Sequence, residues 1–164
     1  MERAGSGATQ VLLECFPRMR RKGRRAVIVA GRGNNGGDGF VIARLLRRRG
    51  VRTDVALLAP AADIAGDAER QLRAYRRGRG PLHEILSSAD LGLLQRMMQG
   101  ADLAVDAIFG TGLSKPVHGV HAEAIELLNA SGPSDLTLTI SMDNSDNGEV
   151  QFHCERFKLS CDFI

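Results

Sequence analysis

A glycine-rich segment with two amide side chains and a carboxylate stands between a predicted strand and a predicted helix. Residues 31–39 read Gly-Arg-Gly-Asn-Asn-Gly-Gly-Asp-Gly. Glycines let a backbone approach a ligand closely, and a helix N-terminus favours anionic groups. Amide and carboxylate oxygens suit hard cations and sugar hydroxyls. The segment is therefore a candidate ligand-binding loop, because a simple tight connector would leave its polar side chains unexplained.

The glycine spacing of this segment also matches the dinucleotide fingerprint, but the companion features are missing. Gly31, Gly33 and Gly36 fit the pattern G-x-G-x-x-G. A dehydrogenase of this type also carries an acidic residue at the end of its second strand, whereas that strand here ends Leu58-Ala59-Pro60. No Gly-Lys-Ser/Thr follows, which excludes a Walker A loop. A hydride-transferring dehydrogenase is therefore disfavoured.

A second motif, at residues 105–116, reads Val-Asp-Ala-Ile-Phe-Gly-Thr-Gly-Leu-Ser-Lys-Pro. Asp106 falls inside an apolar strand expected over 103–109, where an isolated carboxylate is costly to bury. Two interpretations stay open, a hydrogen bond to a neighbouring loop or a role in ligand binding. Parallel strands end at one edge of a sheet, so Asp106, the glycine-rich segment and Asp143 should converge there. This edge is the candidate site.

Alternating strand and helix patterns organise most of the chain. The continuous apolar run 26–30 predicts a strand buried on both faces. The other expected elements are strands at 55–59, 83–86 and 103–109, and helices at 8–19, 40–49, 61–77, 91–98 and 122–129. This succession predicts a Rossmann-like three-layer α/β/α sandwich with a mostly parallel central sheet, formed as a single domain over 1–164.

The last thirty or so residues have a different pattern. Apolar and polar residues alternate over 136–142 and again over 157–163, with a polar turn expected at 144–148. Such alternation is typical of strands with one solvent-facing side. Residues 134–164 are therefore predicted to be a divergent tail of the same domain.

Composition narrows the class of protein. With 164 residues, 43% of them hydrophobic and 25% charged, the chain suits one globular domain. No apolar run is long enough to span a bilayer and no signal peptide opens the chain, so no membrane association is expected. An odd number of cysteines (Cys15, Cys154 and Cys161) without C-x-x-C spacing indicates reduced thiols. A cytoplasmic location is expected, with a mitochondrial or secreted form left open.

Together the two motifs resemble those of the NAD(P)H-hydrate epimerase family, whose domain is the YjeF N-terminal type. Residues 1–5, Met-Glu-Arg-Ala-Gly, are similar to a segment of that family's first helix, and the resemblance covers residues 1–133. It implies a Rossmann-like fold and an isomerase of nicotinamide nucleotide repair. Such an enzyme interconverts the R and S forms of hydrated NADH and NADPH (NADHX and NADPHX) at ring carbon 6. An ADP- or ATP-dependent NAD(P)H-hydrate dehydratase is the partner that uses the S form.

The resemblance also implies roles for individual residues. Asn35 and Asp106 would hold a potassium ion. Asp143, the counterpart of a family aspartate, would bind the substrate and carry the acid–base step. The residues implied to line the substrate or close over it are Asn34, Asn35, Gly36, Gly37, Asp38, Gly110, Thr111, Gly112, Leu113, Ser114, Lys115 and Pro116.

The chain departs from the family pattern at both ends. Family members begin before the Met-Glu-x-Ala-Gly segment, so the front of the first helical region is expected to be missing. The family turn Val-Asp-x-Pro-Ser-Gly is replaced by Ser-Met-Asp-Asn-Ser-Asp at 141–146, which leaves Ser145 and Asp146 as candidates for the potassium-binding serine. The alternative function is a non-catalytic protein- or nucleotide-binding module that retains the fold. A homodimer is compatible with either interpretation.

Positive charge is concentrated in residues 1–52, which carry 13 Lys+Arg and 3 Asp+Glu. Such a field could attract nucleic acid, but with one Tyr and no Trp the chain offers little on which bases could stack. We therefore expect no dedicated nucleic-acid surface, and any binding to oligonucleotides should weaken steeply as salt rises. A salt titration checks this, and tight binding that persists at physiological salt would contradict it.

Overall fold

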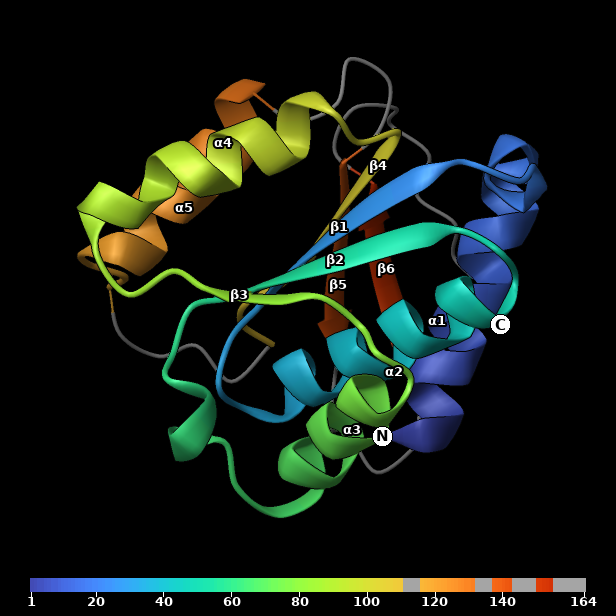
Figure 1. Cartoon of the computed structure of the whole chain (residues 1–164), viewed down its shortest axis with the longest axis horizontal. Helices are drawn as coiled ribbons and strands as arrows, with labels where there is room; N and C mark the ends of the chain where they lie inside the picture. The colour runs from blue at the N-terminus through green and yellow to red at the C-terminus, as the bar shows by residue number, and fades with distance from the viewer. Residues whose placement is uncertain (111–115, 132–136, 143–149, 155–164) are drawn as a thin grey trace.

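A six-stranded sheet forms the centre of the molecule, in the order β3-β2-β1-β4-β5-β6 (Figure 1). This computed structural model describes residues 1–110, 116–131, 137–142 and 150–154. Adjacent strands pair in parallel from β3 to β5, and β6 pairs antiparallel with β5. The strands are β1 Arg25–Ala30, β2 Arg52–Leu57, β3 Leu82–Glu84, β4 Leu103–Ala107, β5 Thr137–Met142 and β6 Val150–Cys154.

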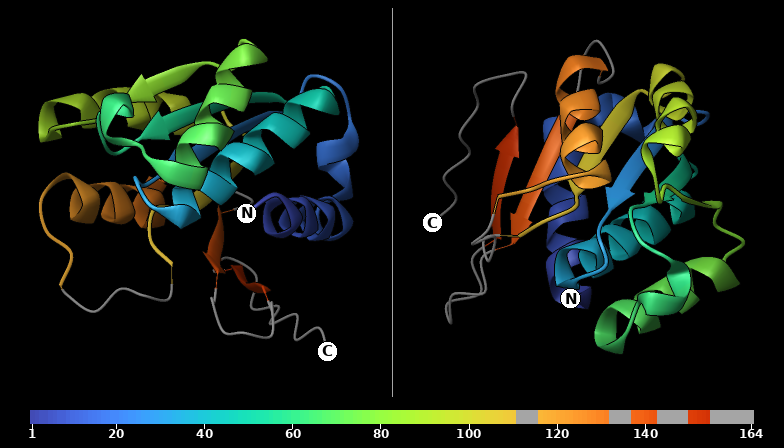
Figure 2. Two further views of the ribbon diagram at one scale, coloured as in Figure 1. Left: turned by 90° about the horizontal axis from the view of Figure 1, so that it is seen from below. Right: turned by 90° about the vertical axis from the view of Figure 1, so that its left-hand side faces the viewer.

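Helices cover both faces of this sheet (Figures 1 and 2). One face packs against α1 (Glu2–Cys15), α2 (Asn34–Arg48) and α3 (Gly66–Arg77). The other face packs against α4 (Leu91–Gln99) and α5 (Val120–Ser131). Short 3-10 turns lie at Pro17–Arg20, Ala61–Asp63 and Ser88–Asp90. The predicted three-layer α/β/α sandwich with a mostly parallel sheet is confirmed.

Strand β1 is the centre of the core, and its residues alternate between the two helical layers. Ile28 belongs to the cluster under α1, α2 and α3, whereas Val27 and Val29 belong to the cluster under α4 and α5. All three side chains are at most 1% exposed. Fully burying a side chain of this size contributes about 1.5–3 kcal/mol. The apolar run 26–30 therefore fixes the strand from both sides, as its sequence predicts.

Two helices begin earlier than their apolar spacing indicates. Helix α2 starts at Asn34 rather than at residue 40, because the glycines of its first turns carry no apolar side chains that could show a helical period. Gly39 shows why a glycine is needed there: a Cβ would lie 2.8 Å from the Ala107 Cβ on β4. Helix α1 spans Glu2–Cys15, and Pro17 begins a separate 3-10 turn.

The tail contains a strand that the sequence did not predict. Strand β5 lies close to the expected alternation at 136–142, and β6 lies beside it, as the right-hand view of Figure 2 shows. The signal for β6 is short, because Val150, Phe152 and Cys154 alternate with only two polar residues. The turn expected at 144–148 and the alternation over 157–163 lie outside the described residues. In the described part of the chain, no helix is long and apolar enough to cross a membrane.

Candidate active site

The glycine-rich segment and the residues that follow β4 meet at one edge of the sheet. Strands β1 and β4 are hydrogen-bonded neighbours, with Val29 opposite Asp106 and Ala30 opposite Ala107. Beyond the end of β1, the Gly31 N–H donates to the Ala107 carbonyl at 3.1 Å. The expected adjacency of the strands at 26–30 and 103–109 is therefore confirmed, and both motifs reach the carboxyl edge of the sheet.

Two glycines of the segment allow backbone to lie directly on backbone. A Cβ on Gly31 would lie 2.1 Å from the Ile108 carbonyl oxygen, and a Cβ on Gly36 would lie 1.9 Å from the Gly31 carbonyl oxygen. Neither position can hold even a methyl group without moving main chain. Gly33, in contrast, is exposed and has nothing within 4 Å of its Cβ position. Gly31 therefore serves the packing of the two loops, and Gly36 serves the packing of the glycine-rich segment on itself.

Asn35 is the most informative side chain at this edge. It lies in the first turn of α2, is 6% exposed, and its Nδ2 donates to the Phe109 carbonyl at 2.9 Å. That bond fixes the side chain between α2 and the turn after β4. Its Oδ1 is buried and has no hydrogen-bond partner. An unsatisfied buried polar atom costs about 1–3 kcal/mol, so this oxygen is a candidate ligand for a cation or a donor group.

The backbone N–H groups at the start of α2 are also without a side-chain cap. Its N-cap residue is Gly33, which has no side chain to cap the helix, and no acidic residue lies in the first turn. The first backbone N–H groups of a helix have no partner within the helix, and together with the helix dipole they attract anions. The N-terminus of α2 can therefore receive a phosphate group.

Asp106 occupies the penultimate position of β4 and is half-buried. One carboxylate oxygen, Oδ1, accepts a hydrogen bond from the Ile108 N–H at 2.9 Å. Ile108 lies in the bend that directly follows β4, so this bond is local and does not join Asp106 to a neighbouring loop. A carboxylate has about four acceptor positions, so this bond does not prevent the group from also ligating a cation.

Asp38 lies deeper, where α2 faces α1. The residue is 4% exposed, its Oδ1 has no hydrogen-bond partner, and the Met1 amine nitrogen lies 4.0 Å from that oxygen. Burial away from water raises the pKa of this carboxyl to about 6, and the nearby amine partly opposes the rise. The structure therefore holds Asp38 at the interface between the two helices.

The remaining residues of the predicted site fall into three groups. Asn34 is exposed at the start of α2, while Gly36 and Gly37 are buried in its first turns. Gly110 is half-buried just after β4, and Pro116 is exposed. The others lie outside the described residues: Thr111, Gly112, Leu113, Ser114, Lys115, Asp143, Ser145 and Asp146.

The donor set at this edge determines which cation it could hold. Among the described residues, no group of three or more His, Cys, Asp or Glu side chains could bind a metal ion. The oxygen ligands that the described residues offer near this edge are the Asn35 amide oxygen, the Asp106 carboxylate and backbone carbonyls. Oxygen ligands of this kind suit hard cations, and a single carboxylate balances a single positive charge. The residues present therefore fit a hard cation, a class that includes potassium.

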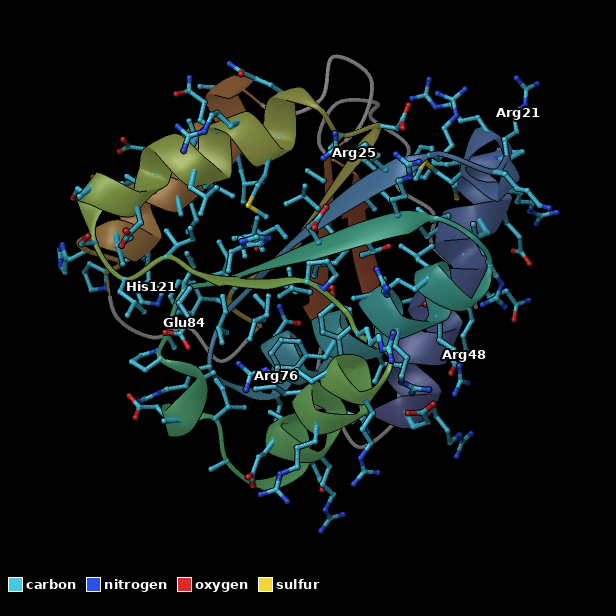
Figure 3. The ribbon with its side chains drawn as sticks, in the orientation of Figure 1. Arg21, Arg25, Arg48, Arg76, Glu84 and His121 are labelled. Atoms are coloured by element: carbon cyan, nitrogen blue, oxygen red, sulfur yellow. The ribbon has the colours of Figure 1, made fainter. Side chains whose placement is uncertain are left out.

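Two side chains that the sequence analysis did not assign also reach this side of the molecule. His121, in the first turn of α5, packs its ring on Phe109 with 5.5 Å between the ring centroids. Glu84 ends β3, and Figure 3 shows both labelled residues on the side where β1 and β2 end. The predicted strand at 83–86 could have pointed to Glu84, whereas His121 alone gave no signal beyond that of a surface residue.

Comparisons with known proteins point to one family. The model of the family described as YjeF-related protein N-terminus matches residues 1–161. An NAD(P)H-hydrate epimerase of Rhodobacter capsulatus is 38% identical over 136 residues, which cover 81% of this chain and 60% of that protein. An NAD(P)H-hydrate epimerase of Rhodopirellula baltica is 31% identical over 159 residues, which cover 94% of this chain and 62% of that protein.

Two further matches define the extent of the similarity. The bifunctional NAD(P)H-hydrate repair enzyme Nnr of Moorella thermoacetica is 44% identical over 106 residues, covering 65% of this chain and 20% of that protein. The crystal structure of yeast ynu0 (YNL200c) has the same fold, with a TM-score of 0.72 and 24% identity over 85% of this chain and 58% of that one. The chain thus spans less than two thirds of the length of each of these proteins.

The glycine contacts predict a contrast between two substitutions. Gly36→Ala should lower the free energy of unfolding by about 1–3 kcal/mol, because its methyl group meets the Gly31 carbonyl. Gly33→Ala should change it by no more than about 0.5 kcal/mol, since its Cβ enters open space. Denaturant unfolding of both variants measures the difference. Equal stability of the two variants would contradict the close approach of Gly36 to the Gly31 carbonyl.

Asp38 predicts a pH-dependent difference in stability. Its raised folded-state pKa means that the folded chain keeps a proton that the unfolded chain loses between its ordinary pKa near 3.8 and about 6. Stability from this group is therefore greatest at low pH and is lost as pH rises through that window. Asp38→Asn should be more stable than the parent above pH 6, by on the order of 2 kcal/mol. The advantage should shrink towards pH 4, and a pH-independent difference in unfolding would contradict this account.

Proposed function

Because the chain belongs to the YjeF-related protein N-terminus family, we propose that it is an NAD(P)H-hydrate epimerase. This isomerase would interconvert the R and S forms of hydrated NADH or NADPH. The observation that carries the proposal is the buried, unpartnered Oδ1 of Asn35, held at the open N-terminus of α2 against the turn after β4. Relatives of this chain carry the name of this activity.

The start of α2 would bind the pyrophosphate of the nucleotide. Its uncapped N–H groups and the positive end of the helix dipole favour a doubly charged anionic group. Gly33 and Asn34 leave this end of the helix exposed to the ligand. The contacts of Gly31 and Gly36 hold the turn in place before the ligand arrives, which reduces the entropy lost on binding.

Asn35 and Asp106 would hold a potassium ion beside the nucleotide. The amide oxygen of Asn35 lacks a partner and the Asp106 carboxylate belongs to the neighbouring strand, so a cation between them would relieve the cost of the buried oxygen. When bound, the ion supplies a fixed positive charge next to the phosphates. Asn35 would keep its orientation through the bond to the Phe109 carbonyl.

Asp143 would carry the proton at the hydrated ring. It follows Met142, the last residue of β5, a strand that pairs in parallel with β4. A carboxylate can accept a proton from the hydrated nicotinamide and return it, which is the machinery an epimerisation requires. An NAD(P)H-hydrate dehydratase would then consume the S form, a link that the bifunctional relative supports by its name.

The proposal predicts different losses for the two aspartates. Asp106→Asn should weaken potassium and nucleotide binding together, by roughly tenfold or more, since the variant lacks the charge that balances the cation. Asp143→Asn should keep nucleotide binding and lose turnover. The pure R hydrate is incubated with each protein in potassium or in choline buffer, and the two epimers are separated by chromatography. Calorimetric titration with nucleotide provides the binding arm.

Asp67→Asn is the matched control, because this aspartate is exposed in the first turn of α3 and is paired with Arg70. It should behave as the parent in both arms. If Asp143→Asn equilibrates the hydrates as fast as the parent, Asp143 is not the acid–base residue. If the parent binds nucleotide without turnover, the function is that of a nucleotide-binding module.

A further inference from the structure

Glu84 places a carboxylate where the sequence of β2 lacks one. Strand β3 pairs in parallel with β2, and Glu84 lies opposite Leu57, the last residue of β2. The Glu84 Oε1 accepts a hydrogen bond from the Ala61 N–H at 2.9 Å, in the turn that follows β2. Glu84 therefore lies beside the end of the second strand, the place where dinucleotide-binding folds carry an acid.

The carboxylate of Glu84 remains available to a ligand. The residue is exposed, and among the residues that the structure describes no cation lies within ion-pair distance of it. Its bond to Ala61 uses Oε1 and fixes the direction of the side chain, while Oε2 can accept hydrogen bonds. Figure 3 shows Glu84 on the side where β1 and β2 end, which is also the side of the α2 N-terminus.

The order of the strands decides which half of the nucleotide meets Glu84. With the pyrophosphate at α2, the nicotinamide half would extend over β4 and β5, where Asp106 and the proposed acid–base residue belong. The adenosine half must then extend in the opposite direction, over β2 and β3, because the order is β3-β2-β1-β4-β5. This step rests on the proposed function, since it takes the orientation of the substrate from it.

We propose that Glu84 accepts hydrogen bonds from the adenosine ribose hydroxyls and makes this chain prefer hydrated NADH to hydrated NADPH. A carboxylate is an acceptor only, so it pairs with the 2′-hydroxyl of NADHX. The 2′-phosphate of NADPHX offers no hydroxyl at that position and adds negative charge beside the carboxylate. The discrimination therefore combines an attractive contact to one substrate with repulsion of the other.

Glu84→Gln tests the proposal with little disturbance of the fold. The amide oxygen of the substituted side chain can still accept the Ala61 N–H, so the variant should unfold at the same denaturant concentration as the parent. We expect the parent to have a higher kcat/KM for NADHX than for NADPHX. In the variant, the ratio of these two kcat/KM values should fall by at least about tenfold. Calorimetric titration with NAD⁺ and NADP⁺ should show the same change without turnover.

Two further variants make the result specific. Arg32→Gln removes an exposed cation from the turn before α2, the proposed pyrophosphate site, and should weaken the binding of both nucleotides alike. Glu126→Gln removes an exposed acid from α5 and should leave the ratio unchanged. A parent with equal or reversed preference overturns the assignment of Glu84, as does an unchanged ratio in Glu84→Gln. A loss confined to NADPHX in Arg32→Gln also overturns it. Absence of both turnover and nucleotide binding in the parent instead rejects the proposed function itself.

Discussion

The structure depends on the direct approach of three backbone segments at the carboxyl edge of the sheet. Gly36 lies on the Gly31 carbonyl, and Gly31 lies on the Ile108 carbonyl, with no room for a Cβ at either glycine. These contacts bring the N-terminus of α2 onto the turn that follows β4. The bond from Asn35 to the Phe109 carbonyl can form only because of that approach. The geometry of the edge is thus set by missing side chains as much as by those present.

Among the described residues, the buried polar side-chain atoms that lack a hydrogen-bond partner lie on helix α2. The described side-chain atoms that are buried without a hydrogen-bond partner are the Asn35 Oδ1, the Asp38 Oδ1 and the Arg44 Nε, all of them on α2. Their surroundings differ, because Asn35 faces the turn after β4, whereas Asp38 and Arg44 face α1 through Met1 and Glu2. Only the first of these atoms lies at the sheet edge. This difference makes Asn35 the candidate ligand for a cation, whereas the burial of Asp38 raises the pKa of its carboxyl.

The sequence could predict the elements whose side chains repeat with a clear period, and it failed where no such period exists. The buried strand at 26–30 and its neighbour at 103–109 were predicted and confirmed, because continuous apolar runs have few alternatives. The start of α2 was missed, since glycines give no periodic signal. Glu84 was missed for another reason: the acid was sought along β2, whereas register brings it from β3. A contact between strands distant in sequence cannot be derived from either strand alone.

The two ends of helix α2 differ in charge, and this difference keeps part of the chain's positive charge away from the candidate site. Its last turn contains Arg47 and Arg48, which complement the negative end of the helix dipole, while its first turn has neither an acid nor a side-chain cap. The charge excess of residues 1–52 therefore includes positions at the far end of α2, away from the edge where the two motifs meet. Asp106 and Glu84 are two acidic groups at that edge, on strands that lie on opposite sides of β1 and β2. The end of α2 between them then attracts the anionic pyrophosphate of the nucleotide. Glu84 selects the adenosine half by hydrogen bonding, and Asp106 acts on the nicotinamide side by binding a cation, so neither acid acts through the net charge of the chain.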